Sequence, residues 1–110
     1  MNINYHQNGH ILHCHIQGDM TVETSSDIKR SFMKNIRSSK WNILINLKGV
    51  TKTDVAGIAT LIEFTKILKE LGGSLKLAEL PENILDLLEI TKSRKLFEIY
   101  ESDEDALRHF

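Results

Sequence analysis

The chain has 110 residues, and its 14 Lys and Arg against 15 Asp and Glu give a formal net charge of -1. With 41% hydrophobic and 26% charged residues, the composition excludes a disordered chain and predicts one globular domain over residues 1–110. The single cysteine, Cys14, excludes an internal disulfide and suits a reducing compartment. No apolar run approaches the ~20 residues that cross a bilayer, and the N-terminus lacks a signal-peptide core. We therefore expect a soluble, cytoplasmic protein with no direct membrane insertion.

The first sixteen residues predict a β-hairpin. Polar and apolar residues alternate on both sides of Asn8-Gly9, which is a strong turn signal. In the second strand, Cys14 belongs to the apolar face, whereas His13 and His15 share the opposite face.

Helices and strands are predicted to alternate after the hairpin. A helix is expected over residues 21–39, because Ile28, Phe32 and Ile36 recur every four residues and form one apolar stripe. The later elements are a buried strand at Trp41–Leu47, a polar loop at Lys48–Thr53, a helix at Val55–Leu71, a strand at Ser74–Ala78, a helix entered at Pro81, a strand at Leu96–Tyr100 and a last helix capped by Ser102. The order ββαβαβαβα predicts an α/β fold with a mixed, mostly parallel sheet, an N-terminal hairpin and about four helices.

Basic residues are concentrated in the first predicted helix and just after it, at Lys29, Arg30, Lys34, Arg37 and Lys40. Such a run could contact nucleic acid. The helical spacing and the near-neutral overall charge favour a solvated helix face instead. We expect no nucleic-acid partner.

The histidines are candidate metal ligands. His13 and His15 lie two apart on one strand, and His6 or His10 could lie nearby on the paired strand. A zinc site requires three or four ligands with supporting contacts, and Cys14 points to the other face. We therefore expect surface histidines and no metal site.

Signatures of catalysis and of cofactor binding are absent from the sequence. It has no glycine-rich phosphate loop after a strand and no serine in a nucleophile elbow. Cys14 lies in a strand rather than at a helix N-terminus that would activate it. The carboxylates Glu101 and Asp103–Asp105 lie in a helix-capping region, where the helix dipole favours acidic residues. We predict that the protein is not an enzyme and needs no cofactor.

The start of the helix at Val55–Leu71 is the most informative segment. Either Thr53 or Asp54 can cap it. Gly57 in its first turn costs up to ~1 kcal/mol relative to alanine, which indicates close approach by a partner, a neighbouring loop or the sheet. The helix is apolar over more than half its circumference. This pattern favours packing against both sheet and a neighbouring helix, although a rim containing Phe64 and Ile67 could face a partner.

Several segments in order resemble the STAS domain, the family of bacterial anti-sigma factor antagonists, over nearly the whole chain. The segments are Gly18–Met20 after the second strand, Leu44–Leu47 followed by Thr53–Gly57, Ile90–Tyr100, and then Ser102 with Ala106 and Leu107. The resemblance implies the STAS fold and an Asp-Ser-Ser-Gly switch whose second serine is phosphorylated by a partner kinase that is also an anti-sigma factor. The unphosphorylated form would bind that partner, and phosphate would end binding.

This sequence departs from the family pattern at the switch itself. Val55 and Ala56 replace both serines between Asp54 and Gly57, so the usual phosphate acceptor is missing. Thr21 also stands where the family often has aspartate. Phosphorylation at Thr51, Thr53 or Thr60 stays open, although Thr53 is equally well explained as a helix cap.

The leading hypothesis is a non-enzymatic regulator that binds a serine-kinase-type anti-sigma factor, or a related signalling partner, without a phosphorylation switch at Ala56. The predicted partner-binding residues are Gly18, Asp19, Thr21, Thr51, Thr53, Asp54, Val55, Ala56, Gly57 and Ile58. The alternative is an accessory or scaffold subunit, attached to a lipid-transporter ATPase or a signalling assembly. A nucleotide-binding role is disfavoured because no phosphate loop is present. The sequence does not fix the partner, the pathway or the oligomeric state, and a homodimer stays open.

Overall fold

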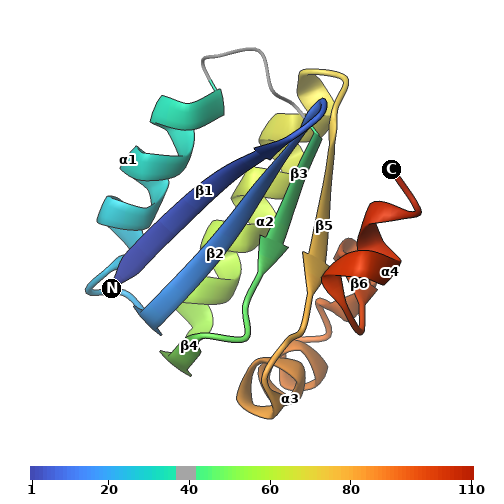
Figure 1. Cartoon of the computed structure of the whole chain (residues 1–110). Coiled ribbons are helices and arrows are strands. Elements are labelled where there is room, and N and C mark those ends of the chain that lie inside the picture. The colour runs from blue at the N-terminus through green and yellow to red at the C-terminus, as the bar shows by residue number, and fades with distance from the viewer. Residues whose placement is uncertain (37–41) are drawn as a thin grey trace.

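A computed structural model describes residues 1–36 and 42–110 (Figure 1). Residues 37–41 lie outside the described residues. They include the expected last turn of the first helix, the basic residues Arg37 and Lys40, and Trp41, the expected start of the buried strand. Among the described residues, no helix is both long and apolar enough to cross a membrane.

The described residues form one six-stranded sheet. Its strands are β1 (Asn2–Asn8), β2 (Ile11–Met20), β3 (Asn42–Asn46), β4 (Val50–Thr53), β5 (Ser74–Ala78) and β6 (Glu98–Tyr100). The main path runs β1-β2-β3-β5-β6, with β1 antiparallel to β2 and the other neighbours parallel. The predicted α/β fold with a mostly parallel sheet and an N-terminal hairpin is confirmed. The turn lies one residue later than expected, because Asn8 already pairs with Ile11.

Four α-helices and one short 3-10 helix accompany the sheet in the described part of the chain. They are α1 (Ser25–Ile36), α2 (Val55–Glu70), α3 (Glu82–Ile90), η1 (Arg94–Leu96) and α4 (Asp103–Leu107). The first helix begins four residues later than predicted. Hydrogen bonds explain this, because the Thr24 hydroxyl donates to the Asp19 carbonyl and accepts from the Thr21 amide, which holds the preceding residues in a turn.

Strand β4 corrects the prediction of a polar loop from Lys48 to Thr53. The first part of β2 pairs with β3, and β4 continues beside its last part, with Gly18 opposite Val50 and Met20 opposite Thr53. A register shift after Gly18, whose φ is +101°, lets β2 bend between its two partners. The observed order is therefore ββαββαβαβα, with the 3-10 turn before β6.

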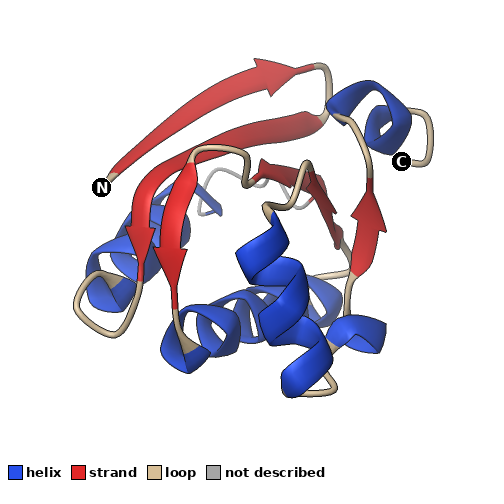
Figure 2. Cartoon of the chain, turned by 90° about the horizontal axis from the view of Figure 1, so that it is seen from below, coloured by secondary structure: helices blue, strands red, loops and turns tan. Residues whose placement is uncertain are grey.

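The two faces of the sheet are covered unequally. Figure 2 shows α1, α2 and α3 on one side and the short helix α4 on the other. The main apolar core lies under α1 and α2. There the rings of Phe32 and Phe64 stack with centroids 3.7 Å apart. Phe64 is buried and Ile67 is partly buried against the same core, so packing explains the wide apolar arc of α2, and the suggestion that Phe64 lies on an exposed rim is wrong.

Candidate functional site

Asp54 organises the N-terminus of α2 by binding two separate segments. One carboxylate oxygen, Oδ1, accepts a hydrogen bond from the Gly57 amide at 3.0 Å and caps the helix. The other, Oδ2, accepts from the Val22 amide in the β2–α1 loop, also at 3.0 Å. Hydrogen bonding from the Val22 amide is the main reason that the pKa of Asp54 lies below its usual value, with the amides of Gly57 and Ala56 and the charge of Lys52 acting in the same direction.

The close approach suggested by Gly57 is made by the protein's own chain. A Cβ atom added at this position would overlap the carbonyl group of Met20 at the end of β2 and lie 2.8 Å from Thr53 Oγ1. Glycine is therefore required where α2 crosses the end of β2. Of the explanations left open by the sequence, close packing on the sheet is the one that the structure supports, because Met20 and Thr53 are the last residues of β2 and β4.

An apolar pair is exposed beside this helix start. Val22 is 67% exposed and Val55 is 62% exposed, and both flank Asp54. Nearby, the Thr51 hydroxyl donates to Asp19 Oδ1 at 3.0 Å, which joins β4 to the end of β2. We call the surface formed by Asp19, Val22, Thr51, Asp54 and Val55 the α2 N-terminal surface.

The residues predicted to bind a partner all come together around the α2 N-terminus, at three depths. Asp19, Thr51 and Val55 are exposed, Gly18, Thr53, Asp54 and Ala56 are half-buried, and Thr21, Gly57 and Ile58 are buried. The Ile58 side chain is only 1% exposed and belongs to the main core, so it can support the surface from beneath but not contact a partner. Whether the exposed members bind a partner stays a prediction.

Val22 was missed by the sequence reasoning. A usable signal existed, because Val22 is an apolar residue that does not fall on the stripe of Ile28, Phe32 and Ile36. An apolar residue off the buried stripe, next to a predicted binding loop, is a candidate for an exposed contact.

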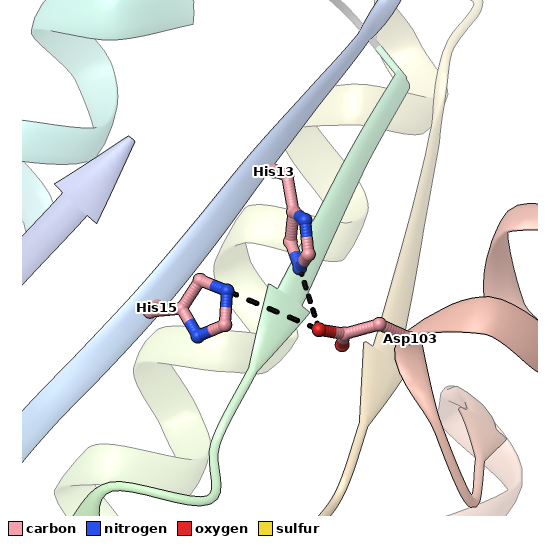
Figure 3. Close-up of side chains that lie close together, drawn as sticks. All are labelled: His13, His15 and Asp103. Carbon is pink, nitrogen blue, oxygen red and sulfur yellow. Dashed lines mark ion pairs between the residues drawn. The ribbon is translucent and has the colours of Figure 1, made fainter. Parts of the chain in front are cut away.

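A second group of side chains lies on the opposite face of the sheet (Figure 3). His13 and His15 project from β2, and Asp103 projects toward them from the first turn of α4. The Nε2 atoms of His13 and His15 lie 3.0 Å and 3.9 Å from Asp103 Oδ2. Burial lowers the pKa of His13, against the opposing effect of Asp103, and the neighbouring His15 and His6 add to the lowering.

This grouping corrects the expectation of surface histidines for His13, whose side chain is only 12% exposed and lies against Asp103. Asp103 was interpreted only as a residue of a helix-capping region, and Ser102 does cap α4 by accepting from the Asp105 amide at 3.1 Å. Capping leaves the Asp103 carboxylate free to face β2. Only the packing of α4 against the sheet brings these residues together, so sequence spacing gave no signal for it.

The chain is thus a mixed α/β domain in which the N-terminus of α2 and the ends of β2 and β4 form an exposed, partly apolar surface, the α2 N-terminal surface. Comparison with protein families matches the STAS domain over residues 2–106, and the chain belongs to this family. The resemblance predicted from the sequence is thereby confirmed.

Known relatives agree with this assignment. The chain is 27% identical over 108 residues to the anti-sigma-B factor antagonist of Bacillus subtilis, covering 98% of each protein. A crystal structure of a Thermotoga maritima protein superposes with a TM-score of 0.91 at 16% identity, covering 97% of this chain and 92% of that one. An anti-sigma-factor antagonist (STAS) domain protein from Planctomyces limnophilus gives 0.84 at 18% identity, covering 97% and 96%. At these identities the two structures support the fold alone.

Proposed function

We propose that this STAS domain is a non-enzymatic regulator that binds an anti-sigma factor through the α2 N-terminal surface. The observation that carries the proposal is the pair of exposed valines, Val22 and Val55, held beside Asp54 at the start of α2. The name of the Bacillus subtilis relative, an anti-sigma-B factor antagonist, indicates the class of partner.

The chemistry of this surface suits protein binding. Protein interfaces commonly have an apolar centre from which water is excluded and a polar rim that supplies hydrogen bonds. Val22 and Val55 provide the centre, while Asp19 and Thr51 provide polar groups beside it. The two hydrogen bonds of Asp54 hold the loop and the helix together before binding, which lowers the conformational entropy lost in the complex.

We further propose that binding is not switched by phosphorylation at position 56. Ala56 is half-buried in the first turn of α2 and carries no hydroxyl. Thr60 is a poor substitute acceptor, because its side chain is buried and its hydroxyl donates to the Ala56 carbonyl at 3.0 Å. Thr51 is exposed, but its hydroxyl is bound to Asp19. A kinase that reaches the family position would therefore find no nucleophile there.

Val55→Glu tests the surface, with Leu71→Glu as the matched control. Both residues are exposed and apolar. They lie at opposite ends of the 16-residue helix α2, which are separated by about 24 Å at 1.5 Å per residue. Tagged proteins are isolated from native cells, and co-purifying proteins are quantified by mass spectrometry. We expect wild type and Leu71→Glu to retain an anti-sigma factor and Val55→Glu to lose most of it, because a charge would be buried at the interface.

Two results would contradict this assignment. Undiminished retention by folded Val55→Glu would misplace the surface. A stoichiometric complex with a transporter ATPase, rather than with an anti-sigma factor, would favour the accessory-subunit alternative.

Ala56→Ser tests the switch. We expect the cognate kinase to phosphorylate this variant but not wild type, as read by intact-mass spectrometry of purified proteins. Phosphorylation of wild type at any threonine would overturn the unswitched mode while leaving the binding surface untouched.

A further inference from the structure

We propose that His13, His15 and Asp103 form a binding site for a divalent transition-metal cation, for which Zn²⁺ is the best fit. The site lies on the sheet face covered by α4, whereas the α2 N-terminal surface is built around the helix on the other face (Figures 2 and 3). It does not depend on the proposed function.

The donor atoms are already gathered to nearly the right separations. One ligand atom from each of the three residues lies within 4.8 Å of the other two. Asp103 Oδ2 is 3.0 Å from His13 Nε2 and 3.9 Å from His15 Nε2. Tetrahedral Zn²⁺ with ligands at ~2.0–2.1 Å requires neighbouring donor atoms about 3.3 Å apart. Small side-chain rotations would therefore place a cation between all three.

The His13 nitrogen is buried, and Asp103 is its one close polar contact among the described residues. Its Nε2 atom lies 3.0 Å from Asp103 Oδ2, but this contact does not meet the geometry of a hydrogen bond. Buried polar atoms are normally bound in good geometry. A cation bound jointly by this nitrogen and this oxygen would satisfy both atoms.

Asn46 supplies the supporting contact that a metal-binding carboxylate usually has. Its side-chain oxygen accepts from the Lys48 amide at 2.9 Å, which fixes the orientation of the side-chain amide. The Asn46 Nδ2 group then donates to Asp103 Oδ1 at 2.9 Å and to Glu79 Oε2 at 2.8 Å. Because Oδ1 is engaged in this way, Oδ2 is the oxygen that faces the histidines (Figure 3).

The surroundings permit both entry and an open coordination position. The His15 side chain is 41% exposed, while that of His13 is 12% exposed. Beside them lies a depression of about 450 Å³ lined in part by His15, Lys48, Glu79 and Asp103. Glu79 adds negative charge there and Lys48 adds positive charge. Water in this depression could supply the fourth ligand, as in zinc sites with three protein ligands.

The ligand set selects the class of cation. Imidazole nitrogen combined with one carboxylate suits Zn²⁺ and its first-row neighbours, whereas Mg²⁺ and Ca²⁺ prefer oxygen ligands throughout.

The test titrates ZnCl₂ into untagged, chelator-treated protein at pH 7.5 by isothermal calorimetry. We expect one Zn²⁺ per chain in wild type, and an affinity at least about tenfold weaker in both His15→Ala and Asp103→Asn. His10→Ala is the matched control, because His10 lies in the exposed β1–β2 turn outside the three-residue group. Its affinity should equal that of wild type.

Spectroscopy with Co²⁺ provides a readout independent of affinity. Wild type should show the visible absorption of low-coordinate Co²⁺, which Zn²⁺ displaces and millimolar Mg²⁺ does not. The variants are first checked by circular dichroism, and the exposure of His15 makes His15→Ala the safest for folding. Absence of stoichiometric Zn²⁺ binding by wild type overturns the proposal. Equal weakening by His10→Ala, or undiminished binding by His15→Ala and Asp103→Asn, overturns it as well.

Discussion

The two faces of the sheet use the same strands for different purposes. From β2, Cys14 and Ile16 enter the large apolar core under α1 and α2, while His13 and His15 point to the face covered by α4. The α4 face has a small apolar cluster and buries charge, since Lys76 is 4% exposed with its Nζ 2.9 Å from Glu98 Oε1. Most of the stabilising apolar burial therefore lies on the α1 and α2 face, and polar side chains on the α4 face displace little of it.

The largest expected effect tests whether the α2 face of the sheet contributes more to stability than the α4 face. Phe64→Ala should destabilise the protein by about 3–5 kcal/mol, because Phe64 is fully buried and stacked on Phe32. Phe110→Ala, on the α4 face, should cost only about 1 kcal/mol. That ring is half-buried and contacts mainly the small cluster and Lys76, whose Nζ lies 4.8 Å from its centroid.

Urea unfolding followed by circular dichroism measures both changes. Equal losses for the two phenylalanines would show that the α4 face contributes as much as the α2 face, and the division would fail.

The next effect concerns the contact between α2 and the end of β2. Gly57→Ala should destabilise by about 1–2 kcal/mol, since the methyl group would overlap the Met20 carbonyl. If Gly57 had no such role, alanine would instead stabilise the helix by up to about 1 kcal/mol. The sign of the change in the free energy of unfolding thus decides between the two explanations. Ala59→Gly, at an exposed position of α2, calibrates the helix-propensity part.

Local patterns predicted most of the fold. Strand β5 was predicted at its observed bounds, Ser74–Ala78, and α2 was predicted to within a residue, because apolar periodicity and end signals agree there. Strand β4 was missed because only Val50 of its four residues is buried. Without the last part of β2 as a partner, so short and polar a segment reads as a loop.

The same contrast holds for the two candidate sites, where contacts close in sequence could be predicted and contacts distant in sequence could not. The sequence predicted either Thr53 or Asp54 as the cap, and Asp54 is the one that accepts from the Gly57 amide, three residues away. The hydrogen bond from the Val22 amide, 32 residues distant in sequence, follows only from the folded chain. Asp103 was the hardest to predict, since capping already explained an acidic residue after Ser102 and its contacts with His13 and His15 depend on how α4 docks.

The smallest expected effect concerns Asp54, the aspartate at the start of α2. Asp103, on the other face, contacts side chains, whereas Asp54 is held by backbone amides, and these amides lower the pKa of Asp54 in the folded protein. Its contribution to stability is then fully present above the unfolded value, about 3.9, and is lost as pH falls through the folded pKa. Asp54→Asn should therefore be less stable than wild type at pH 7, and the difference should shrink as pH is lowered below 4.

Amide NMR makes this last prediction specific to one carboxylate. The Val22 and Gly57 amides donate to the two oxygens of Asp54, so their proton shifts should titrate together with a midpoint below about 3.9. Both transitions should vanish in Asp54→Asn. A midpoint at or above the ordinary value, or different midpoints for the two amides, would mean that Asp54 does not hold the β2–α1 loop against α2. The α2 N-terminal surface would then form only on binding, and its valines would not be preorganised.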